Sequence, residues 1–165
     1  MLPAKRLLAW HQAKEALRAA REEQKRLEEA IAAAERRVAE KEEQLRRLPV
    51  PANPDEEIAR MLLEQEWWLA KKERDDAAAS YADRNGEQEP TIQQLQFDIM
   101  QLEAGLDPEF LRAYLRLSET KALPIAEVRN KCCMGCCLPL SLRKLDEWRR
   151  GKGPVFCDEC DRILV

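Results

Sequence analysis

Two C-x-x-C pairs near the C-terminus constrain the fold of this chain more than any other feature. The first pair is Cys133 and Cys136, and the second is Cys157 and Cys160. The segment between the pairs is at the upper end of the ~15–20 residues that separate the halves of a four-cysteine zinc site. Zinc favours four thiolates in a tetrahedron, and two residues between ligands let one tight turn (a knuckle) present both sulfurs to the same ion. The spacing therefore predicts one structural Zn²⁺ held by two knuckles.

Two other uses of paired cysteines are less consistent with the sequence. A disulfide framework needs an oxidising compartment, and the N-terminal residues do not resemble a signal peptide. A dithiol redox motif normally accompanies a βαβ pattern, which is not seen here. Cys132 and Cys137 flank the first pair, and either is an alternative ligand through a C-x3-C register. Knuckle geometry favours the inner pair, with Gly135 supplying a left-handed backbone conformation and room for N–H groups near the sulfur.

The composition is typical of long helices. Charged residues make up 36% of the chain and aromatic residues 5%, which is the profile of a coiled coil rather than of a thick globular core. No stretch approaches the ~20 apolar residues of a membrane span. We therefore expect a protein of the cytoplasm, where thiols stay reduced and free to bind metal. The net charge of −3 does not by itself indicate affinity for nucleic acid.

The segment from about Pro3 to Leu48 has a heptad pattern that predicts one long helix. Only Gln24 and Lys41 break its apolar seam, and Pro49 follows its last turn. A helix of this length cannot bury its own stripe, so it needs a partner helix. The positions of the seam are Trp10, Ala13, Leu17, Ala20, Gln24, Leu27, Ile31, Ala34, Val38, Lys41, Leu45 and Leu48.

The short proline-rich link that follows predicts an antiparallel hairpin rather than a parallel dimer. The second arm begins with Asn53 as N-cap and Pro54 as the first helical residue. Asn85-Gly86 and Pro90 predict an interruption of this arm. Its apolar face is expected to consist of Ile58, Met61, Leu62, Trp68 and Leu69. Because an exposed Trp and a weak seam after these residues also suit a bundle of two chains, the sequence leaves monomer and dimer open.

The last third of the chain is expected to form short elements around the cysteines. Asp107 starts a connecting helix and Ser141 caps a second short helix, with strands over 125–131 and 162–165. The second helix is expected to carry, on one face, Leu142, Leu145 and Trp148. The predicted fold class is mainly α: a long antiparallel coiled-coil helical hairpin (1–106), a connecting helix (107–123) and a small C-terminal C4 zinc ribbon (124–165).

The residues of this tail resemble those of a known family. They run Ala126-Glu127-Val128, Cys133-x-Gly135-Cys136, Leu138-Pro139-Leu140 and Cys157-x-x-Cys160-x-Arg162-Ile163-Leu164. The chain thereby resembles bacterial C4-type zinc-ribbon proteins that have an N-terminal coiled-coil hairpin. The resemblance implies zinc ligands at the four paired cysteines and a non-enzymatic role. It further implies a link to flagellar or type III secretion systems, through an alternative sigma factor, a secretion component or transcript binding.

Two groups of residues are candidates for binding a partner. Trp67 and Trp68 point about 100° apart on a helix, so they cannot both face the seam, and the exposed one either docks a partner or covers the seam edge. The only histidine, His11, is expected on the surface. The second group is a basic cluster that either contacts phosphates or an acidic partner, or is a solvated helix face. It consists of Arg143, Lys144, Arg149, Arg150 and Lys152, with Trp148 as the accompanying aromatic residue.

These features predict a binding protein and not an enzyme. Four thiolates close a zinc site to water, and no glycine-rich phosphate loop is present. We expect an adaptor or chaperone for a protein partner of secretion, flagellar or transcription machinery. One alternative is a regulator that binds RNA or DNA through the ribbon. Another is a thiol–zinc redox switch, which the extra thiols of Cys132 and Cys137 favour.

Overall fold

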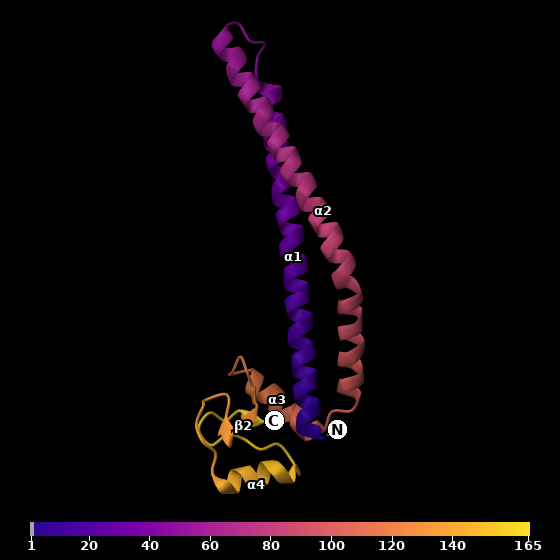
Figure 1. The fold of residues 1–165 in the computed structure, drawn as a ribbon, viewed down its shortest axis with the longest axis vertical. Coiled ribbons are helices and arrows are strands. Elements are labelled where there is room, and N and C mark those ends of the chain that lie inside the picture. Colours follow the sequence, from indigo (N-terminus) through magenta and orange to yellow (C-terminus); the bar gives the residue numbers. More distant parts are fainter. Residues whose placement is uncertain (1) are drawn as a thin grey trace. The chain divides into compact units, whose positions relative to one another are not determined.

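The computed structural model describes residues 2–165 as a mainly helical chain with a few short strands near the C-terminus. The two long helices pack against each other as antiparallel arms, and the cysteine-bearing tail follows them (Figure 1). The predicted fold class is thereby confirmed. The helices are α1 (Pro3–Arg47), α2 (Pro54–Ala104), α3 (Pro108–Ser118) and α4 (Leu142–Arg150), and the strands are β1 (Ile125–Ala126), β2 (Val128–Arg129), β3 (Cys132–Cys133) and β4 (Ile163–Leu164).

The chain divides into two compact units. The hairpin unit is Arg18–Gln93, and the head unit combines Met1–Leu17 with Gln94–Val165. The head unit therefore takes in the first turns of α1 and the last turns of α2 as well as the cysteines. The division into a hairpin (1–106), a connecting helix (107–123) and a zinc ribbon (124–165) stays a prediction.

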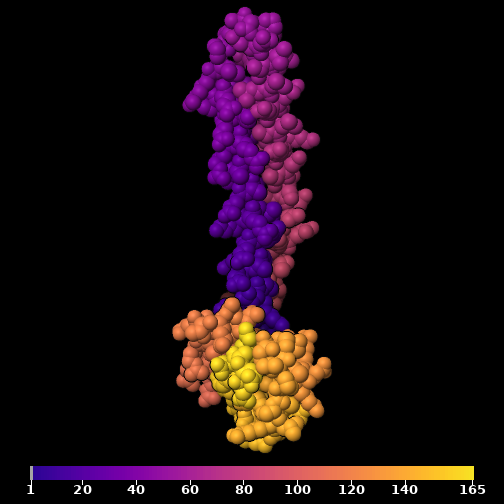
Figure 2. All heavy atoms as spheres, turned by 90° about the vertical axis from the view of Figure 1, so that its left-hand side faces the viewer, coloured from indigo at the N-terminus to yellow at the C-terminus, as the bar shows by residue number. Residues whose placement is uncertain are grey.

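The hairpin unit has the heptad seam expected for α1. Ala34 and Val38 of α1 and Ala70 of α2 are buried in it. The two polar positions of the seam are paired with the opposite arm. The Gln24 side-chain amide donates to Asn85 Oδ1 at 2.7 Å, and Lys41 forms an ion pair with Glu66. In Figure 2 the two arms, indigo and magenta, are in contact along the visible face.

The predicted interruption of the second arm is wrong, because α2 continues through Asn85, Gly86 and Pro90. A proline inside a helix removes one backbone hydrogen bond and disfavours the preceding turn. Tertiary contacts on both sides of it outweigh this cost. Before the proline, the Asn85 side chain accepts a hydrogen bond from Gln24 of α1. After it, the Ile92 side chain is 5% exposed in the seam.

The face expected for the second arm is also wrong. Its five side chains, which are Ile58, Met61, Leu62, Trp68 and Leu69, are 55–62% exposed. The residues of α2 that lose exposure at this level are Leu63, Trp67 and Ala70, and the Trp67 Nε1 atom donates to Glu42 of α1. The sequence carries two apolar stripes here, and only the one spaced 63–67–70 packs against α1.

The core of the head unit joins α1, α3 and the strands. Leu7, Trp10, Phe110 and Ile163 are at most 3% exposed. The last turns of α2, with Ile99 and Leu102, and Leu106 just after the helix pack against this core.

His11 belongs to this core, which corrects the expected surface position. The side chain is 7% exposed, and its Nδ1 lies 2.8 Å from the hydroxyl of Tyr114. The Tyr114 ring also packs edge-on against Trp10 at 5.1 Å. A buried polar side chain needs a hydrogen-bond partner. Here that partner comes from α3, 103 residues away in the sequence, so the local pattern around His11 does not indicate it.

The predicted strand over 125–131 is two shorter strands. β1 pairs in parallel with β4, and β2 pairs with β3 in an antiparallel hairpin. The hairpin turn consists of Asn130 and Lys131, both with positive φ, as in a two-residue type I′ turn. The C-terminal residues (yellow in Figure 2) lie between the α3 segment and the rest of the ribbon.

Candidate metal centre

The first knuckle follows directly from β3. Cys133 is the last residue of that strand, and its carbonyl accepts a hydrogen bond from the Cys137 N–H at 2.8 Å. The Gly135 N–H points to the Cys133 sulfur at 3.4 Å. The left-handed residue is Cys137, with φ of 61°, and not Gly135 as expected. Glycine is needed for space, because a Cβ at this position would lie 2.7 Å from the Cδ of Arg162.

The second knuckle repeats this backbone pattern. The Asp161 N–H donates to the Cys157 carbonyl at 3.0 Å, and Asp161 is left-handed with φ of 56°. In both knuckles the left-handed residue therefore lies four positions after the first cysteine. The Cys157 N–H donates to the Arg162 carbonyl at 2.9 Å, which ties the knuckle to the start of β4.

The two knuckles bring the four predicted cysteines together. The sulfurs of Cys133 and Cys160 are 3.7 Å apart, and those of Cys136 and Cys157 are also 3.7 Å apart. All four sulfurs lie within 4.8 Å of one another. A tetrahedron with Zn–S bonds of ~2.3 Å has edges of about 3.8 Å. The cluster can therefore hold one metal ion, and its spacing fits zinc.

Burial and hydrogen bonds shift the pKa values of Cys133, Cys157 and Cys160 in different directions. Cys133 and Cys157 are almost fully buried, and burial raises the pKa of Cys133 to about 12 and also raises the pKa of Cys157. Burial acts in the same direction on Cys160, but hydrogen bonds from the backbone and side chain of Arg162 help lower its pKa to about 7. Since the metal binds thiolates, loading the cluster near neutral pH has to release protons.

Arg162 holds the knuckles in place, a role that the sequence reasoning missed. Its Nη1 donates to the Gly135 carbonyl of the first knuckle at 3.1 Å. Its Nε donates to the Leu123 carbonyl at 2.9 Å. Only Asp161 separates it from Cys160, so the side chain connects both knuckles and the segment that enters β1. The feature of the sequence that could have indicated this role is the position of Arg162, two residues after Cys160.

The flanking cysteines lie outside the cluster. Within residues 2–165, the group of side chains that could hold a metal comprises the inner four cysteines. The sulfur of Cys132 lies 3.6 Å from the Asn130 carbonyl, and Cys137 is exposed. Cys132 and Cys137, the alternative ligands of a C-x3-C register, therefore lie at positions where they are not ligands.

The basic residues of α4 are mostly paired with carboxylates. Ser141 caps the helix as predicted, by accepting from the Lys144 N–H. Arg143 pairs with Glu147. Arg150 pairs with Asp146.

Lys144 is tied to the second knuckle. Its Nζ lies 3.1 Å from Asp158 Oδ1. The hydrogen bond to Asp158 is the main reason why the pKa of Lys144 is raised. Leu142 is 80% exposed instead of sharing the apolar face with the buried Leu145, and the α4 side chain that packs against the buried cysteines is Trp148.

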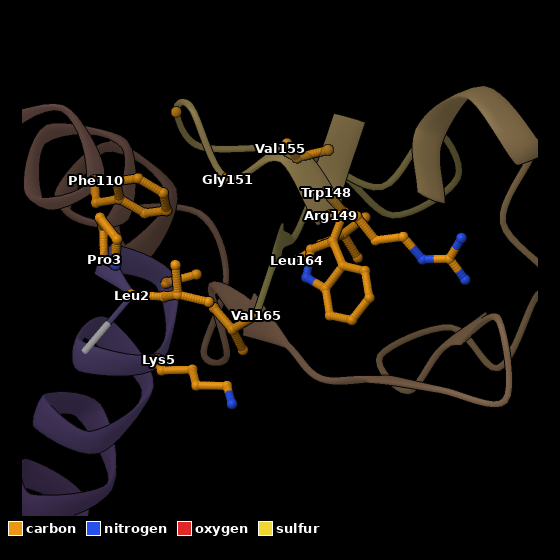
Figure 3. A pocket seen from close by; sticks show the side chains of 12 residues that line it. Leu2, Pro3, Lys5, Phe110, Trp148, Arg149, Gly151, Val155, Leu164 and Val165 are labelled. Atoms are coloured by element: carbon orange, nitrogen blue, oxygen red, sulfur yellow. The ribbon is translucent and has the colours of Figure 1, made fainter. Parts of the chain in front are cut away.

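Trp148 and Arg149 line a cavity of about 290 Å³ in the head unit. Pro3 and Phe110 form one side of it, and Trp148 lies with Leu164 on the other (Figure 3). The remaining lining residues are Leu2, Ala4, Lys5, Gly151, Gly153, Val155 and Val165, so the charged side chains of the lining are those of Lys5 and Arg149. The Arg149 guanidinium extends away from the apolar side chains (Figure 3).

The other two candidate residues belong to the hairpin unit. The rings of Trp67 and Trp68 are 5.0 Å apart and tilted by 65°. Trp67 is half-buried with a bond to Glu42, whereas Trp68 is 62% exposed. The prediction that the two rings cannot share the seam is confirmed. The Lys71 ammonium lies over both rings, at 4.6 and 5.1 Å from their centroids.

No protein-family model and no curated protein matches the chain. Two solved structures are similar over nearly its whole length. CT398 from Chlamydia trachomatis is 22% identical, with a TM-score of 0.36 over 98% of this chain and 84% of that protein. The HP0958 protein from Helicobacter pylori is 15% identical, with a TM-score of 0.37 over 97% of this chain and 80% of that protein. Both TM-scores are below 0.5, so neither similarity indicates a function for this chain.

Proposed function

We propose that the chain is a non-enzymatic adaptor of the cytoplasm, in which one structural Zn²⁺ stabilises a C4 ribbon that binds a protein partner. The observation that carries this proposal is the spacing of the four sulfurs, at 3.7 Å for two pairs and within 4.8 Å overall. Zinc bound there would supply folding free energy to a ribbon whose strands are only two residues long.

A closed thiolate site supports a structural role over a catalytic one. Cys133, Cys136, Cys157 and Cys160 would occupy all four positions of a tetrahedral ion, which leaves none for water or substrate. None of the helices in residues 2–165 has an apolar stretch long enough to span a membrane. A reducing compartment would keep the four thiols available to the metal.

The cavity beside α4 supports a protein partner. Its lining is apolar apart from Lys5 and Arg149, so it suits an apolar side chain of a partner that carries a carboxylate nearby. Three other cations of α4 are paired with carboxylates, which weakens the case for phosphate binding. By the resemblance of the tail, the expected partner is a component of secretion, flagellar or transcription machinery.

The test is affinity capture from native cells with the zinc-loaded full chain, with and without nuclease. Arg149→Glu should lose the captured protein, whereas Arg143→Glu should retain it, because Arg143 points to solvent with 90% of its side chain exposed. Capture that disappears with nuclease and falls steeply with salt would instead identify the chain as a nucleic-acid-binding regulator. Loss of zinc in mild peroxide would favour the redox switch.

A further inference from the structure

An apolar stripe of α2, interrupted by Gln65, is left uncovered in the hairpin unit. It consists of Ile58, Leu62 and Leu69, with Met61 and Trp68 along one edge, and all five side chains are 55–62% exposed. Isolated exposed apolar residues are ordinary, but contiguous ones usually mark an interaction surface. We call these five residues the outer stripe.

The outer stripe lies on the side of α2 away from α1. The side chains facing α1 at this level include Trp67, which bonds to Glu42 of α1, and the buried Ala70. On a helix with 3.6 residues per turn, Leu62 and Leu69 point about 80–120° away from Leu63 and Ala70, and Met61 and Trp68 point about 140–180° away from them. The seam of the hairpin therefore does not account for the outer stripe.

The spacing of the outer stripe is that of a helix-packing seam. Steps of three and four residues alternate through Asp55, Ile58, Leu62, Gln65, Leu69 and Lys72, which are the a and d positions of a heptad. Met61 and Trp68 occupy the adjoining flank positions. The pattern thus predicts that a further helix packs here, with four layers that contain apolar residues and one charged layer at each end.

The charges at the two ends determine which helix fits. The N-terminal end of the seam has Asp55, followed by Glu56 and Glu57, and the other end has Lys71 and Lys72. When two identical copies of α2 pair antiparallel around an axis between Leu62 and Gln65, Asp55 of each copy meets Lys72 of the other. A parallel pair would instead set Asp55 against Asp55. Opposite charges at such positions determine the orientation of paired helices.

We propose that the outer stripe is a self-association surface, at which a second copy of this chain packs antiparallel to form a four-helix bundle from two hairpins. Each copy would cover the stripe of the other, so the contact is self-complementary and closed by a two-fold axis. The two patches together would remove on the order of 1,000 Å² from water, which reaches the lower range of specific interfaces. Met61 of one copy would lie beside Trp68 of the other, a favourable contact of sulfur with an aromatic ring.

Sedimentation equilibrium of the full, metal-loaded chain over a series of concentrations tests the proposal. We expect a reversible dimer, and we expect Met61→Glu to weaken it at least ~10-fold because the carboxylate would be buried without a partner. Met100→Glu is the matched control: the same substitution on the same helix, at a methionine that is 69% exposed outside the outer stripe. Circular dichroism verifies that both variants keep their helices, which the exposure of both side chains favours.

A charge exchange tests the orientation. Asp55→Lys alone and Lys72→Glu alone should each weaken the dimer, since each sets like charges opposite one another twice. An equimolar mixture of the two variants should restore association, because both end layers again pair opposite charges. A wild-type chain that stays monomeric, equal effects of Met61→Glu and Met100→Glu, or no recovery in the mixture would each overturn the proposal. A monomer that uses the stripe only for a different protein would overturn it as well.

Discussion

Arg162 offers the most informative single perturbation of the metal centre. Replacing it with methionine keeps much of the aliphatic side chain but removes the bonds to the Gly135 and Leu123 carbonyls, which are 3.1 and 2.9 Å long. It also removes the side-chain hydrogen bond that helps lower the pKa of Cys160. Arg162→Met should therefore leave both knuckles less well oriented and Cys160 more protonated near neutral pH.

The size of the effect follows from these contacts. Hydrogen bonds of a charged donor contribute ~1.5–3 kcal/mol each when buried, and exposed acceptors reduce this to about 1 kcal/mol each. A loss of about 2 kcal/mol corresponds to a ~30-fold weaker metal affinity, within the ~10–100-fold range for groups that orient metal ligands.

Competition with a chromophoric zinc chelator at constant pH measures this affinity. Arg129→Met is the matched control, because the Arg129 side chain bonds to Glu127 and not to either knuckle. If Arg162→Met bound zinc as tightly as the wild type and Arg129→Met do, the role of Arg162 in holding the knuckles would be refuted.

Three further predictions concern the ligands and the core. Cys133→Ser should abolish stoichiometric zinc binding and unfold the ribbon, since one of four ligands is lost. Leu7→Ala should lower the free energy of unfolding of the head unit by ~2–5 kcal/mol, because Leu7 is 0% exposed, as measured by denaturant titration. Burial and the charge of Glu15 raise the pKa of Tyr114. As pH rises, the unfolded chain therefore loses the Tyr114 hydroxyl proton before the folded chain does. The free energy of unfolding of the head unit should be full below pH ~10 and should fall as pH rises above it. This fall should be smaller in Tyr114→Phe.

Each of these predictions has a control in the same chain. Cys137→Ser should keep the metal, because Cys137 lies outside the cluster. Leu142→Ala should change stability little, since Leu142 is 80% exposed. Tyr81→Phe, in the hairpin unit, should leave the alkaline loss of head-unit stability intact. Metal lost equally from both cysteine variants, or an alkaline loss unchanged by Tyr114→Phe, would contradict the assignments.

Features that depend on local chemistry could be predicted from the sequence. The α1 seam follows from side-chain periodicity alone, and the starts of α3 and α4 follow from Asp107 and Ser141, whose side chains cap the helices as expected. The paired cysteines are equally local, because two residues between ligands suffice for a knuckle. Their meeting as one cluster depended on the spacing between the pairs, which the structure confirms.

Features that depend on tertiary contacts could not be predicted. His11 is buried because Tyr114 supplies its hydrogen bond from another helix. The helix continues through Pro90 because packing against α1 outweighs the local penalty. On the second arm two apolar stripes compete, and periodicity alone cannot tell which one faces α1. The left-handed residue of each knuckle lies four positions after its first cysteine, at Cys137 and Asp161, and Gly135 is needed only to make room for Arg162.

The metal content of the freshly purified, reduced chain tests the central claim most directly. Elemental analysis by plasma mass spectrometry, together with the protein concentration, gives the number of zinc ions per chain. We expect one zinc per chain in the wild type and in Cys132→Ser, and none in Cys157→Ser. Less than stoichiometric metal in the wild type, or zinc retained in Cys157→Ser, would contradict it.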